Sequence, residues 1–315
     1  MKIGIVGSGM VGATAAYAML MKGVGREIIL LDKNRERAES EAFDLTHAIP
    51  FAYALKIRTG SYSDLKGSRL VIVAAGVSQK SGESRRDLLK RNALVFKEII
   101  AEILENAPGT ILVIATNPLD IMTGLADYYA SEKGVPWGRV FGTGTMLDTA
   151  RFRTLLAEHT GVDSSHIHAY VLGEHGDSEV LTWSLVTVGG TKLNEYCRFS
   201  NIDMGEKKRT DIASRVRNAA YEIIKGKGAT YYGIGCAIAK VADVILHDQR
   251  SILTVSVPIT KESDEMRISL SMPHIVGGSG IISPIPLQLS NHEKEELEKS
   301  RKVIESAMKD LKKYI

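Results

Sequence analysis

The chain has 315 residues, of which 44% are hydrophobic and 24% charged, and its formal net charge at pH 7 is +3. This length and composition suit a soluble protein with a sizeable core and room for two domains. The small net charge gives no argument for nucleic acid or membrane partners. Because no signal peptide or apolar run near the ~18 residues of a membrane span is evident, we expect a cytoplasmic protein.

The first predicted elements frame a glycine motif. An apolar strand over residues 2–6 leads directly into GSGMVG at 7–12, and residues 13–21 are rich in helix formers. A second strand, residues 27–31, ends in Asp32, about 20 positions after the last glycine. A lone G-x-G-x-x-G is a weak signal, but this strand–turn–helix context with the following acid predicts a dinucleotide site.

Each residue of this motif has a physical role in that prediction. Gly7 permits the tight turn, Gly9 lets the backbone approach a pyrophosphate, and Gly12 lets the helix pack closely on the strand. The helix N-terminus offers free N–H groups to the phosphates. Asp32 would accept hydrogen bonds from the ribose hydroxyls and repel a 2′-phosphate, which favours NAD over NADP. In the alternative, the glycines only shape a turn and Asp32 only caps a helix, but the combined spacing argues against it.

Further alternation predicts the fold class. Apolar strands are expected at residues 70–75 and 110–116, separated by a helix over residues 88–104. Strands alternating with helices indicate an α/β fold, a Rossmann-type doubly wound parallel sheet covered on both faces. The pattern changes near residues 142–144, so we expect a dinucleotide-binding domain at 1–143 and a mixed α+β substrate domain at 144–315. The latter ends in a charged helix, 291–313, whose apolar stripe predicts core packing.

Two loops at predicted strand ends are candidate ligand contacts. Residues 76–86 form a polar, Gly/Ser-rich loop with two arginines, Arg85 and Arg86, which could close over a substrate or simply be solvated. Asn117 follows the next strand, at the edge where open parallel sheets bind ligands.

The second half holds the residues suited to acid–base chemistry. Asp148 and Arg151 are three apart on a predicted helix, so they share a face. They could form a local ion pair, or Asp148 could orient a base while Arg151 grips a carboxylate bidentately; both interpretations are equally supported. His175 lies between two glycines in GEHGDSE. A lone histidine is usually a turn residue, but hydride transfer to a carbonyl needs a proton donor that titrates near neutrality.

Metal and disulfide chemistry are not expected. The two cysteines, Cys197 and Cys236, have no metal-like spacing and predict free thiols in a reducing compartment. None of the eight histidines forms a helical H-E-x-x-H pattern, so we predict no metal site.

Over essentially its whole length the chain resembles the lactate/malate dehydrogenase family. The matching segments are GSGMVG, the strand end at Asp32, VIVAAGVSQKSGESR, ATNPLD, GTMLDTARFR, GEHGDSE and KGAT. Together these motifs are highly specific. The resemblance implies NAD-dependent, reversible reduction of a 2-oxo acid to an L-2-hydroxy acid, with pyruvate and L-lactate as the substrate pair and oxaloacetate and malate as the alternative.

The resemblance also implies roles for individual residues. His175 matches the family's proton donor and acceptor, Asp148 its carboxylate partner and Arg85 the lid arginine that polarises the carbonyl. The implied substrate contacts are Arg151, Asn117, Gln79 and Thr230. The implied cofactor contacts are Gly7, Gly9, Met10, Val11, Gly12, Asp32, Ala75, Gly76 and Asn117.

The identity of residue 79 underlies the choice of substrate. In this family the residue six before the lid arginine faces the variable end of the substrate, and here it is the neutral Gln79. An arginine there would pair with the second carboxylate of oxaloacetate. A buried unpaired carboxylate is costly, so Gln79 predicts a preference for pyruvate.

The resemblance further implies regulation and assembly. Arg153 and His168 match the positions at which bacterial lactate dehydrogenases bind fructose 1,6-bisphosphate across a two-fold interface. We therefore expect this effector and a homo-oligomer, most simply a tetramer. A non-catalytic nucleotide sensor or a methyltransferase could share the glycine motif, but neither requires His175, Asp148, Arg151 and Arg85 together.

Overall fold

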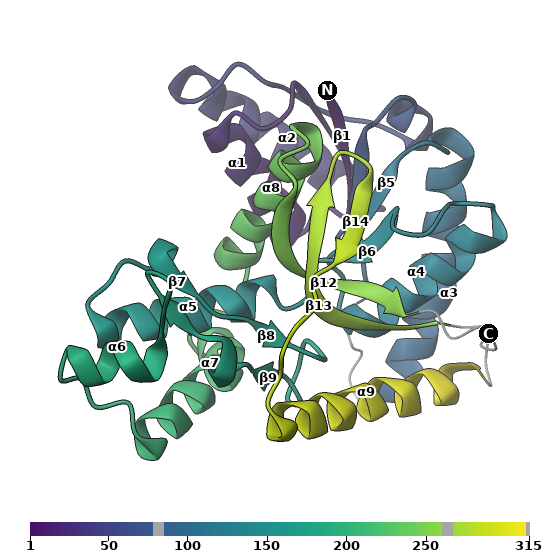
Figure 1. Ribbon diagram of the computed structural model, residues 1–315. Helices are drawn as coiled ribbons and strands as arrows, with labels where there is room; N and C mark the ends of the chain where they lie inside the picture. The colour runs from purple at the N-terminus through teal and green to yellow at the C-terminus, as the bar shows by residue number, and fades with distance from the viewer. Residues whose placement is uncertain (78–84, 260–266, 313–315) are drawn as a thin grey trace.

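The computed structural model describes residues 1–77, 85–259 and 267–312 (Figure 1). Strands of the first half are β1 (Lys2–Val6), β2 (Glu27–Leu31), β3 (Lys56–Thr59), β4 (Leu70–Val73), β5 (Ile111–Ile114) and β6 (Val140–Gly142). Its helices are α1 (Met10–Lys22), α2 (Arg35–Ala48), α3 (Arg85–Asn106) and α4 (Leu119–Glu132), with short 3-10 turns η1 (Ile49–Phe51) and η2 (Tyr62–Leu65).

These strands form a parallel sheet in the order β3-β2-β1-β4-β5-β6. The order reverses between β1 and β4, so the helices that follow β1 and β2 cover one face and those that follow β4 and β5 cover the other. Crossovers of this kind produce a doubly wound sheet with a crevice at the carboxyl ends of the central strands. The predicted α/β fold class is therefore confirmed.

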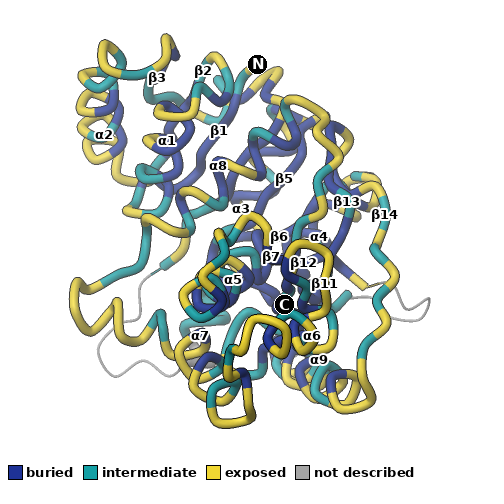
Figure 2. The backbone as a smooth tube through the Cα atoms, turned by 60° about the vertical axis from the view of Figure 1, so that its left-hand side comes forward, coloured by how far each residue is buried: buried dark blue, intermediate teal, exposed yellow. Residues whose placement is uncertain are grey.

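The alternation of side chains along each strand divides the core into two layers. Leu70 and Ile72 of β4 pack in the cluster that includes α1 and α2, whereas Val71 and Val73 pack in the cluster that includes α3 and α4. All four are fully buried, as expected for a parallel strand covered on both faces. Figure 2 shows the central strands of the sheet buried, with exposed residues on the loops and on the outer sides of the helices.

The second half contributes the remaining elements. Its helices are α5 (Met146–Thr160), α6 (Leu193–Phe199), α7 (Glu206–Lys227), α8 (Tyr232–Leu246) and α9 (Asn291–Lys312), with 3-10 turns η3 (Ser164–His166) and η4 (Trp183–Leu185). Its short strands are β7 (Ile167–His168), β8 (Val171–Leu172), β9 (Val180–Leu181), β10 (Thr187–Val188) and β11 (Thr191–Lys192). Three longer strands follow, β12 (Ser251–Ile259), β13 (Ile268–Gly277) and β14 (Gly280–Pro284).

The longer strands of the second half extend the sheet of the first. β12 and β13 pair antiparallel over their whole length, and β12 joins the edge strand β6 through the pair Ser256↔Gly142. In the described residues the sheet therefore has the order β14-β13-β12-β6-β5-β4-β1-β2-β3 and is mixed rather than purely parallel. Helix α8 also belongs to the α1 side of the first-half core (Figure 1). The sequence predicted neither contribution.

Observed boundaries differ slightly from the predicted ones. Helix α1 begins at Met10 rather than Ala13, because Gly9 already has the extended backbone of an N-cap. Strand β4 ends at Val73 and β5 at Ile114, since the residues that follow turn away at the sheet edge to form loops. Helix α3 is longer than predicted, spanning Arg85–Asn106.

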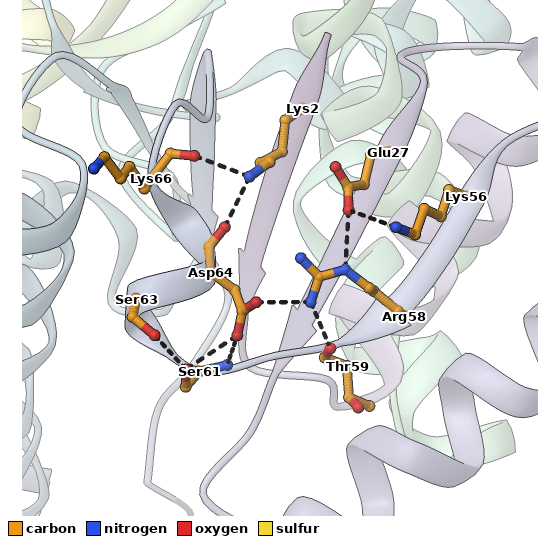
Figure 3. A network of polar contacts seen from close by, with 9 residues as sticks. All are labelled: Lys2, Glu27, Lys56, Arg58, Thr59, Ser61, Ser63, Asp64 and Lys66. Atoms are coloured by element: carbon orange, nitrogen blue, oxygen red, sulfur yellow. Dashed lines mark hydrogen bonds and ion pairs between the residues drawn. The ribbon is translucent and has the colours of Figure 1, made fainter.

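A polar network ties the outer parallel strands together (Figure 3). It lies where β1 and β2 begin, at the end of the sheet opposite the carboxyl ends of the strands. The Arg58 guanidinium on β3 donates to Glu27 of β2 at 2.9 Å and to Asp64 of η2 at 2.8 Å. Backbone and side-chain donors of Ser61, with the Arg58 bond, lower the pKa of Asp64 to about 2. This network braces the rim of the sheet.

The described residues lack the features of two other protein classes. No described helix combines the length and the apolar character needed to cross a membrane. Among the described side chains, no cluster of three or more His, Cys, Asp or Glu residues could hold a metal ion.

Candidate active site

The glycine motif forms the turn between β1 and α1. Gly7 has φ 102°, and a Cβ there would lie 2.4 Å from the backbone nitrogen of Ala75. A Cβ on Gly12 would lie 2.0 Å from the Gly7 carbonyl oxygen, so only glycine allows this close approach. A Cβ on Gly9 would meet nothing within 4 Å, and no side chain caps the helix there. Open space in front of uncapped N–H groups fits a pyrophosphate.

Asp32 lies at the end of β2, beside this turn. Its Oδ2 accepts from the backbone N–H of Ser8 at 2.8 Å, and its Oδ1 accepts from that of Asn34 at 2.9 Å. These bonds hold a half-buried carboxylate against the glycine turn, where it fits the ribose end of a dinucleotide. Met10 and Val11, in the first turn of α1, are exposed and half-buried respectively.

The loops after β4 and β5 lie on the same sheet edge. The Thr116 hydroxyl donates to the carbonyl of Ala75 at 2.6 Å and so links the two loops. Gly76 and Asn117 are exposed at this edge. The predicted cofactor-binding residues are thus gathered along the carboxyl edge of the parallel sheet, in the segments that follow β1, β2, β4 and β5.

Asp148 joins His175 and Arg151 in one cluster. His175 Nδ1 lies 2.6 Å from Asp148 Oδ2, and Arg151 Nη1 donates to Asp148 Oδ1 at 2.8 Å. Asp148 is 2% exposed, whereas the His175 side chain is 26% exposed. One carboxylate therefore makes the local ion pair and also contacts the histidine, whereas the binding of a carboxylate by Arg151 stays a prediction. Arginine has five N–H donors, so Arg151 retains others for a ligand.

The cluster holds a proton on His175 at neutral pH. Burial, the largest influence, lowers the pKa of His175, but the charge and hydrogen bond of Asp148, with smaller contributions from Asp120 and Glu179, raise it to about 9. Burial acts to raise the pKa of Asp148, but His175 and Arg151 outweigh it and the pKa is lowered. Because Nδ1 faces the carboxylate, Nε2 is the ring nitrogen available to a ligand.

The backbone around His175 is held by groups from several elements. The His175 N–H donates to Oδ2 of Asp120 at 2.7 Å, and the Glu174 N–H donates to the Ser300 hydroxyl at 2.7 Å. Gly173 exchanges two backbone bonds with Ser271 of β13, of 2.9 and 3.0 Å. Sequence reasoning quoted Asp120 within ATNPLD but assigned it no role.

Glu179 is a second acidic residue that sequence reasoning missed. It is 4% exposed, and its Oε1 has no hydrogen-bond partner among the residues that the structure describes. Burial, followed by the charge of Asp148, raises its pKa to about 8, although His175, Arg217 and Arg151 oppose the shift. Glu179 is the last residue of the GEHGDSE motif, but the motif alone does not show that its side chain is buried.

The remaining predicted site residues are placed less completely. Arg85 is the first residue of α3, and its side chain and Gln79 lie outside what the structure describes. Thr230 is half-buried in the connection between α7 and α8.

Arg153 and His168 lie away from the His175 cluster. The Arg153 guanidinium packs 5.6 Å from the Tyr170 ring centre, and its Nε donates to the Ala169 carbonyl at 3.0 Å. The exposed His168 adjoins Ala169 on β7. The two candidate effector residues therefore share one neighbourhood of the second half.

Comparison with known proteins agrees with this arrangement. Residues 1–142 match the family described as lactate/malate dehydrogenase, NAD binding domain, and residues 145–315 match its alpha/beta C-terminal domain. The L-lactate dehydrogenase of Geotalea daltonii is 50% identical over 311 residues, with 99% of each chain covered. That of Thermus aquaticus is 47% identical over 307 residues, with 98% of each covered.

Two solved structures also resemble the chain over almost its whole length. The minor L-lactate dehydrogenase from Enterococcus mundtii, in a ligands-bound form, superposes with a TM-score of 0.91 at 39% identity, covering 98% of this chain and 97% of that one. A lactate dehydrogenase from a Medee basin deep-sea metagenome library gives 0.92 at 36% identity, covering 99% and 98%. The chain therefore belongs to the lactate/malate dehydrogenase family, with an NAD-binding domain in its first half.

Proposed function

We propose that the protein is an NAD-dependent L-lactate dehydrogenase that reversibly reduces pyruvate. The observation that carries the proposal is the His175–Asp148–Arg151 cluster, in which a protonated imidazole and a guanidinium share one buried carboxylate. Asp148 is on α5, which follows β6 directly at the carboxyl edge of the sheet, the edge that carries the NAD-binding turn. The names of the full-length relatives favour lactate over malate.

In the proposed reaction, the cofactor would supply the hydride and the protein would supply the proton. Bound NADH supplies the hydride to the carbonyl carbon of pyruvate. His175 Nε2 donates its proton to the carbonyl oxygen, so lactate leaves and a neutral imidazole remains for the reverse reaction. Asp148 keeps Nδ1 protonated and orients the ring, as the carboxylates of other His–Asp pairs do.

Charged and polar residues bind the rest of the substrate in this proposal. Arg151 grips the pyruvate carboxylate, for which a planar bidentate donor is suited. Arg85 compensates the charge that develops on the carbonyl oxygen, a role implied by the family resemblance. Asn117 contacts substrate and nicotinamide, and Thr230 lines the pocket.

The decisive test compares two histidines that each pair with an aspartate. His175→Gln should lower kcat for pyruvate and NADH by about 10²–10⁴-fold, the usual contribution of a general acid. His247, whose Nδ1 lies 2.8 Å from Asp243 on the surface, provides the control, and His247→Gln should leave kcat unchanged. Near-full turnover by His175→Gln, followed at the NADH absorbance band, would show that the assignment is wrong.

Regulation and assembly are also part of the proposal. Arg153 and His168 lie close together, with Arg153 packed on Tyr170 and hydrogen-bonded to Ala169. Two such pairs brought together across a two-fold axis would present two arginines and two histidines to one bisphosphate. We therefore propose a homotetramer activated by fructose 1,6-bisphosphate.

A further inference from the structure

We propose that Asp120 is a positioning residue for His175, whose buried carboxylate fixes the backbone of the catalytic loop and adds a negative charge behind the imidazole. This inference rests on the proposed function of His175. It concerns a residue of the NAD-binding half that has no contact role in that proposal.

Within the described part of the chain, the hydrogen bonds of the Asp120 carboxylate are directed at the loop and at the strands that support it. Asp120 lies in the first turn of α4 and is 3% exposed. Its Oδ2 accepts from the His175 N–H at 2.7 Å. Its Oδ1 accepts from the hydroxyl of Ser256 on β12 and, at 3.2 Å, from that of Ser271 on β13. One carboxylate therefore binds the loop to two strands of the antiparallel hairpin.

The position of the Asp120 bond matters because the neighbouring residues are also held. Gly173 is bonded to Ser271 through both backbone groups, and Glu174 donates to Ser300. The Asp120 bond holds the next residue, which carries the reacting ring. Residues after His175 are held through side chains, since Asp177 accepts from Tyr221 and Ser178 contacts Ser300. Without the Asp120 bond, the backbone N–H of His175 itself would lose its partner, and the 2.6 Å contact with Asp148 would lose that support. A misplacement of about 1 Å at a reacting group can lower a rate by 10²-fold.

The charge of Asp120 acts on the imidazole together with that of neighbouring groups. Asp148 on α5 and Glu179, the residue before β9, raise the pKa of His175. Arg151 on α5 lowers the pKa of Asp148, and Arg217 on α7 acts to lower that of Glu179. Among these, Asp120 is one of the negative groups that raise the pKa of His175. Burial raises the pKa of Asp120 itself to about 6, so it is charged in the neutral and alkaline range in which His175 titrates.

A purely structural role can be separated from positioning because α4 carries a matched aspartate. Asp127 lies two turns after Asp120 on the same helix and is 4% exposed. Burial also raises its pKa to about 6, but its partner is Arg267, at 3.4 Å, and not the catalytic loop. Substitutions at Asp127 therefore reproduce the loss of a buried carboxylate without touching His175.

The test uses the full-length protein with four variants, D120N, D120A, D127N and D127A. An asparagine can still accept from the His175 N–H and can donate to the two serine hydroxyls, so D120N removes charge while retaining geometry. D120A removes both. We expect D120A to lower kcat for pyruvate about 10²-fold below D127A with little change in KM, as misplacement of a proton donor predicts. D120N should retain most of the kcat of the wild-type protein.

The effect of the Asp120 charge on His175 is measured without turnover, by an NMR titration of the ¹⁵N-labelled imidazole. The His175 signal is assigned by its absence from the spectrum of His175→Gln. The titration should move to lower pH in D120N and stay in place in D127N. Equal kcat for D120A and D127A, or an unmoved titration in D120N, would overturn the proposal. If D120A does not fold, the D120N titration decides. If the wild-type protein fails to reduce pyruvate, the proposed function fails, while the titration still tests the action of Asp120 on His175.

Discussion

Asp148 accepts hydrogen bonds from two cationic side chains while almost completely buried, and this sets the pH range of the proposed reaction. The pKa of His175 is raised to about 9 because the attraction of Asp148 outweighs burial. Pyruvate reduction needs the protonated imidazole, so kcat/KM for pyruvate should hold through neutral pH and fall as pH rises through about 9. Lactate oxidation needs the neutral imidazole and should rise over the same interval.

The Asp148→Asn variant tests the origin of this pH limb. Loss of the negative charge leaves burial to dominate, so the limb for pyruvate should move to lower pH and kcat should fall, because the ring also loses its orienting acceptor. The measurement is kcat/KM for pyruvate from about pH 5.5 to 10. Asp243→Asn, which removes the partner of His247, is the control and should leave the limb in place. A wild-type limb in Asp148→Asn would contradict this account.

Substrate preference is predicted to depend on residue 79. Gln79→Arg would supply the counter-charge that the second carboxylate of oxaloacetate lacks in a closed site. An unpaired buried charge costs several kcal/mol, and each ~1.4 kcal/mol is a factor of ten. The ratio of kcat/KM for oxaloacetate to that for pyruvate should therefore rise by orders of magnitude, whereas Gln79→Met should leave pyruvate preferred. A wild-type preference for oxaloacetate would instead indicate a malate dehydrogenase.

At the residue scale, the sequence predicted well those site residues that stand in short local motifs. Asp148, Arg151 and His175 meet in the structure, although the sequence alone left two interpretations open for the first two. Asp120 and Glu179 were not assigned, because their importance comes from burial and from contacts with distant segments. The bond of Asp120 to His175 spans 55 positions, and no local pattern encodes it.

At the scale of elements, the contact between α1 and α8 offers a sharp packing test. A Cβ on Gly235 of α8 would lie 2.6 Å from Thr14 Cγ2 and 3.0 Å from the Thr14 backbone carbon, so the two helices would have to separate. Gly235→Ala should lower the free energy of unfolding by about 1–3 kcal/mol, the range for overpacked cores.

A second helical glycine provides the control for this prediction. Around Gly226 of α7 a Cβ would meet nothing within 4 Å. Gly226→Ala should therefore raise the free energy of unfolding by roughly 0.5–1 kcal/mol through helix propensity alone. Urea unfolding of both variants at equal protein concentration is the measurement. A stabilised Gly235→Ala variant would show that the helices are not in close contact.

The elements of the sheet were predictable to different degrees. Apolar runs flanked by helices identified β1, β2, β4 and β5, because parallel strands buried on both faces have this pattern. The apolar residues of β12 are equally typical of a strand, but they do not indicate which edge of the sheet the strand joins. Its ladder with β6 has a single registered pair, Ser256↔Gly142, which joins residues more than 100 positions apart.

At the scale of the whole molecule, the effector proposal predicts a response that only an assembly can give. Fructose 1,6-bisphosphate should lower KM for pyruvate, with the largest effect in dilute enzyme, because a ligand bound across an interface favours assembly by linkage. Arg153→Gln should abolish the effect while leaving basal kcat largely intact. Activation should weaken as pH rises and histidine charge is lost.

The measurements for this prediction are steady-state kinetics and sedimentation velocity with and without the effector. Arg198→Gln, a change of one arginine elsewhere in the second half, is the control and should still respond. A KM for pyruvate that does not change across a wide effector titration near pH 6, or a protein that sediments only as a monomer, would exclude the proposed site.

The extension of the sheet by β12–β14 has a consequence for the protein during its synthesis. When the ribosome has released β6, the edge of that strand and the face of α1 that α8 will cover are still without their partners. Roughly 100 further residues must be translated first, which takes about 5–20 s at ~5–20 residues per second. Through that interval an unpaired strand edge and apolar helix surface are open to other nascent chains. We therefore expect chaperone dependence of the nascent chain to peak after β6 and to end only once β12 has emerged.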